Sequence, residues 1–141
     1  MAGVIALGLP LAQAAGGDAQ ATRTVAAAAC PSPTDLRALH LYGLWRAEFD
    51  DGERASVLLE RHPEHTDSVR GAVNRQGVQS RLAGDVDDGE LVLDESDDGL
   101  RISAVWVAQA SAAGCGREFR GERRSGSAVR RFVLRRVPGW N

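Results

Sequence analysis

The clearest sign of the fold is a stretch that reads QSRLAGDV over residues 79–86, DDG over 87–89 and ELVLD over 90–94. Apolar and polar residues alternate on both sides of the DDG triplet, which is the period-two pattern of a half-buried β-strand. Asp-Gly favours a tight turn because glycine adopts the positive φ that such a turn requires. The stretch therefore predicts two antiparallel strands joined by a hairpin.

The same pattern continues along the chain in both directions. Runs with strand character recur about every 11 residues, separated by turn-forming residues, and no long segment has the 3.6-residue period of a helix. The exception is a short helical turn near residues 34–39, which Thr34 or Asp35 would cap. The predicted strands cover residues 43–49, 54–61, 67–75, 79–86, 90–94, 100–108, 116–123 and 129–137.

Eight antiparallel strands without covering helices leave two unpaired edges unless the sheet closes on itself. We therefore predict an all-β fold, an eight-stranded antiparallel up-and-down β-barrel with a short N-terminal helical turn. Successive loops of such a barrel alternate between its two ends. This alternation places Cys30 and Cys115 at the same end, together with both chain termini.

Length and composition favour one globular domain. The chain has 141 residues, of which 43% are hydrophobic and 26% charged. All 17 basic residues are arginine, and the formal net charge is only -2. Such a balance gives no overall attraction to nucleic acid, so no nucleic-acid partner is expected.

Residues 1–29 resemble a secretory signal peptide, which would leave residues 30–141 as the barrel domain. Asp18 and Arg23 are the only charged residues before Cys30, and small-residue sites follow an apolar run of about a dozen residues. The run is too short to span a membrane, so the protein is expected to be periplasmic or secreted and not membrane-spanning. The alternative is an alanine-rich disordered tail.

Cys30 and Cys115 are the only cysteines. In an oxidising compartment a chain with two cysteines is expected to join them in a disulfide bond. Two unpaired thiols are the alternative. A lipidated N-terminal Cys30 is a further option, although residues 27–29 lack the large apolar residue of a lipoprotein signal.

Gly43-Leu44-Trp45 opens the first predicted strand, and Arg135-Arg136 lies near the end of the last. This pairing resembles the calycin superfamily, which includes lipocalins, fatty-acid-binding proteins, avidins and small bacterial barrel inhibitors. The SAVW sequence at 103–106 is similar to the avidin-like branch. The resemblance implies that Trp45 plugs one barrel end and a C-terminal arginine packs across it, with Gly43, Trp45, Arg135 and Arg136 forming the structural closure.

Alternation also predicts which side chains point into the barrel. The inward set is mostly aliphatic and includes Leu100, Ile102 and five residues that we predict contact a ligand. An eight-stranded barrel is filled by its own side chains or holds one small ligand. Glu95 would lie near a barrel mouth beside an arginine such as Arg136, either orienting a ligand or forming a structural ion pair. The predicted ligand contacts are Trp45, Phe49, Glu95, Trp106 and Phe132.

These features predict a non-enzymatic binding protein that carries a small apolar ligand. The alternative is an inhibitor or adaptor that binds another envelope protein through barrel loops and a polarised surface. Residues 82–100 contain eight acids and no base, whereas residues 116–137 contain eight arginines and two acids. Such segregation suits a docking surface.

No catalytic residue is predicted, because His40 has no serine or cysteine partner at a readable spacing. The bend at 62–67 holds two histidines and two acids, which makes a metal-dependent activity a remote option. Histidines and acids in an exposed bend are ordinarily solvated, so neither a metal nor a cofactor is expected. The sequence leaves the oligomeric state open.

Overall fold

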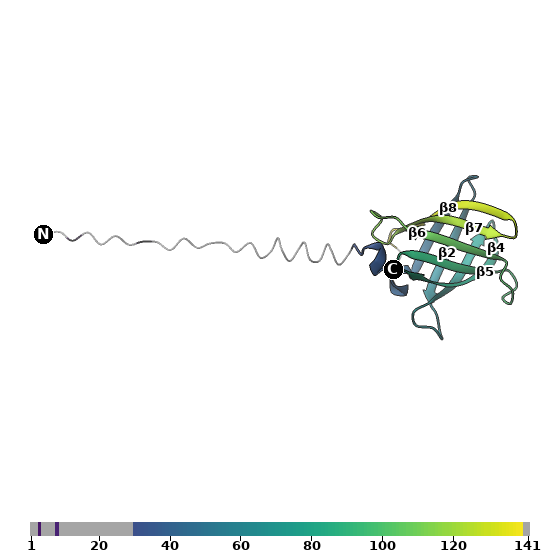
Figure 1. Cartoon of the computed structure of the whole chain (residues 1–141), viewed down its shortest axis with the longest axis horizontal. Coiled ribbons are helices and arrows are strands. Elements are labelled where there is room, and N and C mark those ends of the chain that lie inside the picture. Colours follow the sequence, from purple (N-terminus) through teal and green to yellow (C-terminus); the bar gives the residue numbers. More distant parts are fainter. Residues whose placement is uncertain (1–2, 4–7, 9–29, 140–141) are drawn as a thin grey trace.

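A computed structural model describes residues 3, 8 and 30–139. The leader predicted for residues 1–29 lies outside the described residues except for Gly3 and Gly8. The described chain forms a closed all-β barrel of eight antiparallel strands, as predicted (Figure 1). The strands are β1 Gly43–Phe49, β2 Arg54–Arg61, β3 Val69–Arg75, β4 Val78–Asp87, β5 Glu90–Ser96, β6 Ala104–Ala110, β7 Glu118–Ser125 and β8 Ala128–Arg136.

Each strand pairs with the next one in sequence, and β1 pairs with β8 to close the barrel. The register at Trp45 of β1 illustrates this closure. Trp45 pairs with Val57 of β2 on one side and with Arg136 of β8 on the other. With closure complete, no strand in the sheet has a free edge. The turns β1–β2, β3–β4, β5–β6 and β7–β8 share one end, which we call the open end.

The opposite end, the closed end, is covered by the segment before β1. Two short 3-10 helices, η1 Pro33–Asp35 and η2 Ala38–Leu41, bring Leu36, Ala38 and Leu41 into the core. The predicted disulfide bond is confirmed, because Cys30 is bonded to Cys115 in the loop before β7. The bond fixes this cover to the barrel. Within residues 3, 8 and 30–139, no helix is long and apolar enough to cross a membrane.

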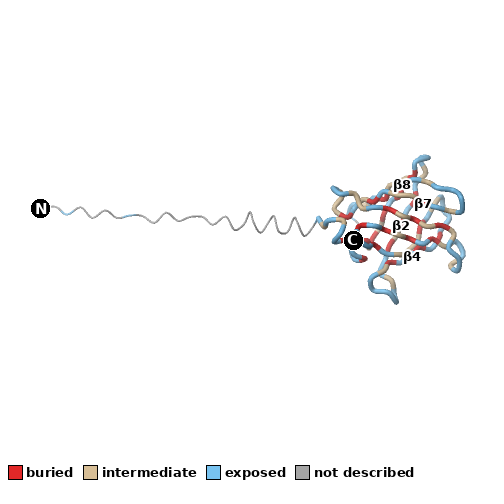
Figure 2. Tube along the Cα trace, viewed as in Figure 1, coloured by how far each residue is buried: buried red, intermediate tan, exposed pale blue. Residues whose placement is uncertain are grey.

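Buried and exposed residues alternate along the strands, so the core runs through the middle of the barrel (Figure 2). Glycine permits close contact between neighbouring strands of the wall. A Cβ atom added to Gly121 of β7 would overlap the carbonyl oxygen of Val107 on β6. The inward positions at the centre are mainly aliphatic and aromatic, as the alternation predicts.

The prediction that Leu100 and Ile102 point inward is wrong, since both side chains are exposed. The Asp98 Oδ1 atom accepts hydrogen bonds from the backbone N–H groups of Leu100 and Arg101, each at 2.8 Å. Side-chain acceptors of this kind compete with strand pairing. The turn is therefore extended, and β6 begins at Ala104 rather than at residue 100.

Candidate functional site

The closed end is built around Trp45. Its indole packs against Phe119 with ring centroids 5.7 Å apart, and its Nε1 donates a 2.8 Å hydrogen bond to the Leu41 carbonyl. The Arg136 guanidinium lies over the indole, 5.4 Å from the ring centroid, and donates a hydrogen bond to the Tyr42 carbonyl. Gly43 takes a φ of 131°, a value that a residue with a Cβ rarely adopts.

Arg135 and Arg136 occupy different environments. Arg135 lies on the outer wall, where it forms ion pairs with Glu48 at 3.7 Å and Glu118 at 3.1 Å. Arg136 has no carboxylate partner among the described residues, and its Nε is buried without a hydrogen-bond acceptor. Burial and the nearby charge of Arg117 lower the pKa of Arg136. Arg136 is thus a cation held by an aromatic face and one carbonyl.

Replacing Arg136 by methionine is expected to change the free energy of unfolding by less than about 1 kcal/mol. The substitution removes a cation–π contact, which contributes about 0.5–2 kcal/mol, but it also removes a partly desolvated charge without a counterion. Urea unfolding of this variant beside Arg123→Met provides the check, because Arg123 has a buried carboxylate partner. A larger loss for Arg136→Met than for Arg123→Met would contradict this explanation.

Three of the predicted ligand contacts pack against one another in the middle of the barrel. The ring centroids of Phe49 and Trp106 are 5.6 Å apart, those of Phe49 and Phe132 6.2 Å, and those of Trp106 and Phe132 4.9 Å. All three side chains are buried, and Trp45 lies apart from them at the closed end. These aromatic rings occupy the lumen themselves.

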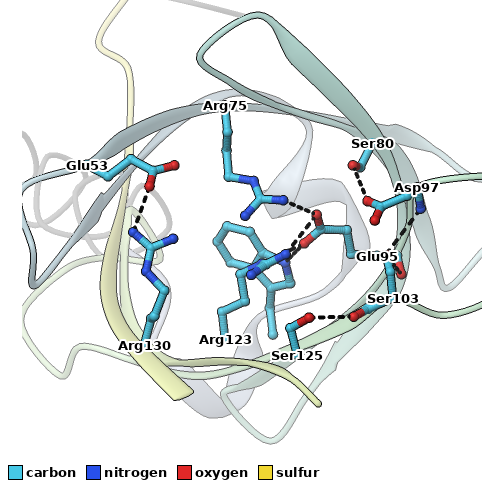
Figure 3. Close-up of polar contacts among 10 residues, drawn as sticks. Glu53, Arg75, Ser80, Glu95, Asp97, Ser103, Arg123, Ser125 and Arg130 are labelled. Atoms are coloured by element: carbon cyan, nitrogen blue, oxygen red, sulfur yellow. Dashed lines mark hydrogen bonds and ion pairs between the residues drawn. The ribbon is translucent and has the colours of Figure 1, made fainter. Parts of the chain in front are cut away.

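Glu95 is fully buried toward the open end, where it faces Arg75 and Arg123 (Figure 3). Its Oε2 accepts hydrogen bonds from Trp106 Nε1 at 2.7 Å and from Arg123 Nε at 2.8 Å. Its Oε1 accepts from Arg75 Nη2 at 3.0 Å and from Arg123 Nη2 at 3.2 Å. Burial raises the pKa of Glu95, but the hydrogen bonds from Arg123 and Trp106 and the two arginine charges outweigh it and lower the pKa overall.

The predicted proximity of Glu95 to Arg136 is wrong, because Arg136 lies at the closed end. The partners of Glu95 are Arg75 on β3 and Arg123 on β7, two inward-facing arginines that the sequence analysis did not identify. Strict alternation supplied the signal: Arg75 follows buried Val73 by two residues, and Arg123 follows Phe119 by four. Because arginine side chains are usually exposed, the sequence alone did not suggest that these two point inward.

Arg130 is a third inward-facing arginine, on β8. Its Nη2 donates to Asp51 Oδ2 at 2.7 Å and to Glu53 Oε2 at 2.9 Å, and its guanidinium lies 4.0 Å from the centroid of the Phe49 ring. Asp51 and Glu53 belong to the β1–β2 segment, so Arg130 ties this turn to β8. The inner side of the open end therefore consists of arginines held by carboxylates.

Hydrogen bonds also join the other three turns of the open end. Ser80 Oγ at the start of β4 donates to Asp97 Oδ1 in the β5–β6 loop at 2.7 Å. Ser125 Oγ at the end of β7 donates to the carbonyl of Ser103 in the same loop at 2.9 Å (Figure 3). The β5–β6 loop is thus fixed to both neighbouring turns, and the three form one connected surface.

That surface carries exposed aliphatic side chains. Val78 is 66% exposed, Leu100 90%, Ile102 61% and Val129 51%. Val78 flanks the β3–β4 turn, Leu100 and Ile102 lie in the β5–β6 loop, and Val129 follows the β7–β8 turn. We call these four residues the aliphatic rim. Leu39, the other large apolar side chain with comparable exposure in the described chain, lies at the closed end.

Known proteins provide no further guide to this surface. No protein-family model, curated protein or solved structure matches the chain. Its function is therefore inferred from its own geometry.

The bend at residues 62–67 is organised by its own backbone. His62 Nδ1 accepts hydrogen bonds from the N–H groups of Glu64 and His65, each at 3.1 Å. Among the residues that the structure describes, no three His, Cys, Asp or Glu side chains are grouped to hold a metal ion. The Nδ1 atom of His62 therefore serves as a hydrogen-bond acceptor within the bend itself.

Three shallow hollows lie on the outer wall. They have volumes of about 520, 350 and 570 Å³. The first and second share Glu48 and Arg135, and the third is bordered by β2, β3 and β4. Glu48 and Arg135 pair with each other, so the charges in this part of the wall are locally compensated.

Proposed function

We propose that this chain is an exported, non-enzymatic binding protein of calycin type that recognises another protein through its open end. The observation that carries the proposal is the aliphatic rim. Exposed apolar side chains that stand among polar groups at one end of a fold are a common feature of protein interaction sites. Here four of them lie on three turns that hydrogen bonds hold together.

Prior ordering of these turns supports binding. A surface whose loops are already fixed loses less conformational entropy when a partner docks. Glu95 fixes the strands beneath the rim, because it joins β5 to β3 through Arg75 and to β7 through Arg123. The polar groups inside the open end therefore stabilise the shape of the proposed interface.

The packing of the lumen favours this function over transport of a small apolar ligand. The space between Phe49, Trp106 and Phe132 is taken up by contacts among the rings themselves. Glu95, the polar group that would orient a ligand, already accepts four hydrogen bonds from protein donors. A ligand would have to displace these contacts.

Two features support export. The disulfide between Cys30 and Cys115 suits an oxidising compartment such as the periplasm or the extracellular medium. The sequence of residues 1–29 has the character of a secretory signal. The Gly-x-Trp and terminal arginine add the likeness to calycins, whose members include small bacterial barrel inhibitors.

The test compares proteins retained from an envelope extract by immobilised wild type and by two variants. Leu100→Ser with Ile102→Ser removes the centre of the rim, and Leu39→Ser removes an exposed leucine at the closed end as a matched control. All these side chains are exposed, so both variants are expected to fold. We expect a partner that wild type and Leu39→Ser retain in 1:1 stoichiometry and that the rim variant retains at least about tenfold less.

Equal retention by the rim variant and the control would contradict recognition through the open end. Native mass spectrometry of the protein purified from its source adds a second criterion. A stoichiometric small apolar molecule that disappears on substitution of Trp106 or Phe132 would instead establish the carrier function.

A further inference from the structure

The charged groups around the aliphatic rim indicate the chemistry of its partner. We propose, on the basis of the proposed function, that the rim binds a protein segment in which carboxylate side chains alternate with apolar ones. In this arrangement Leu100 receives the apolar contact, and Arg81 and Arg101 pair with the carboxylates.

The carboxylates of the β5–β6 loop are engaged within the protein. Asp98 accepts hydrogen bonds from two backbone N–H groups and from Ser96 Oγ, and Asp97 accepts from Ser80 Oγ. Glu95 is enclosed by Arg75, Arg123 and Trp106. The Oδ1 atoms of Asp97 and Asp98 and both oxygens of Glu95 thus accept hydrogen bonds that form the loop and its support.

Two arginines beside Leu100 have no such engagement. Arg101 follows Leu100 directly, and Arg81 lies against the same loop, since a Cβ atom on Gly99 would come within 2.8 Å of Arg81 Nη1. Both arginines are exposed, and across residues 30–139 neither takes part in an ion pair. Their guanidinium donors are available to a partner.

The turns around Leu100 carry a small excess of positive charge, the same sign as Arg81 and Arg101. The three connected turns, residues 74–81, 95–103 and 122–131, contain seven arginines and four acids, and two further acids, Asp51 and Glu53, pair with one of these arginines, Arg130. The excess positive charge favours an acidic partner during approach. Guanidinium groups also bind carboxylates through paired hydrogen bonds with defined geometry.

Apolar and charged groups together define one class of partner. The most exposed aliphatic side chain of the rim, Leu100, follows Gly99, which Arg81 approaches, and precedes Arg101. Neither arginine forms an ion pair within residues 30–139. A partner with only apolar side chains would leave both guanidinium groups next to a desolvated contact without acceptors, which is unfavourable. A segment with alternating apolar and acidic residues satisfies both kinds of group at once.

Two synthetic peptides test the inference, acetyl-Leu-Glu-Leu-Glu-Leu-amide and the same peptide with glutamine in place of glutamate. Binding is measured by NMR titration of the backbone amides of residues 97–103 in the full chain. The indole N–H of Trp45 at the closed end serves as an internal control. We expect the glutamate peptide to bind the rim at least about tenfold more tightly, with a difference that narrows at high salt.

The variant Arg81→Gln with Arg101→Gln completes a double-mutant cycle. It is expected to abolish the preference for the glutamate peptide, whereas Arg46→Gln with Arg61→Gln, two exposed arginines of β1 and β2 away from the rim, is expected to retain it. Equal affinity for both peptides, with both weakened by Leu100→Ser, would overturn the carboxylate inference and leave the proposed function standing. Absence of saturable shifts at residues 97–103 would also overturn the inference, while the retention experiment decides the proposed function separately.

Discussion

Replacement of Glu95 by glutamine is expected to lower the free energy of unfolding by about 3 kcal/mol, because it leaves two inward-facing arginines without their carboxylate. Each carboxylate oxygen accepts hydrogen bonds from two protein donors. Whichever oxygen becomes the amide NH₂ group therefore faces N–H donors instead of accepting from them. Urea unfolding followed by tryptophan fluorescence measures the loss, with exposed Glu60→Gln as the control. Unfolding of Glu95→Gln at the wild-type midpoint would contradict the structural role assigned to Glu95.

The same substitution has a pH signature. In the folded protein the pKa of Glu95 lies below its ordinary value of 4.5. A carboxyl group whose pKa is lowered by folding stabilises the protein above its unfolded pKa, and that contribution is lost as the pH falls through the folded pKa. The difference in stability between wild type and Glu95→Gln should therefore be largest near neutral pH and should shrink below pH 4.5. A difference that grows in acid would contradict this prediction.

Removal of the disulfide bond by Cys30→Ser with Cys115→Ser is expected to cost up to about 4 kcal/mol. The bond joins residues 85 positions apart, and closing so long a loop restricts the unfolded chain strongly. The barrel itself should persist, because β1 and β8 pair through their own register. The change should appear as a lower urea midpoint with an unchanged far-UV circular dichroism spectrum.

Hydrogen exchange locates the effect of the missing bond. Amides of η1 and η2 should exchange faster in the variant, since Cys30 no longer anchors the segment that covers the closed end, whereas amides of β4 and β5 should stay protected. Reduced wild type should behave like the double variant. Equal midpoints for oxidised and reduced wild type would show that the bond does not stabilise the fold.

The sequence was sufficient to predict most of the architecture. Hairpins were predicted because Asp-Gly turns have a strong local preference, and Gly52, Gly89 and Gly99 all take the expected positive φ. Strands β1 and β2 match their predicted bounds, and the alternation of the loops placed Cys30 at the same end of the barrel as Cys115. These features depend on local turn geometry and on the number of strands.

The open end was harder to predict, because side-chain hydrogen bonds shape it. Asp98 redirects the chain after Gly99 and exposes Leu100, which an uninterrupted strand would have buried. The acceptor that draws Arg75 and Arg123 inward is Glu95, which lies on β5, two strands away in sequence order from each of them. Pairings of this kind depend on how the closed barrel sets its strands side by side. The aliphatic rim was therefore not recognisable before the turns were placed in space.

Hydrogen–deuterium exchange of the protein in complex with its partner tests most directly whether recognition takes place at the open end. We predict that binding slows exchange in the three turns around residues 76–78, 97–103 and 125–129, and leaves residues 31–41 at the closed end unchanged. Protection of residues 31–41 with no change in the three turns would contradict the proposed mode of recognition.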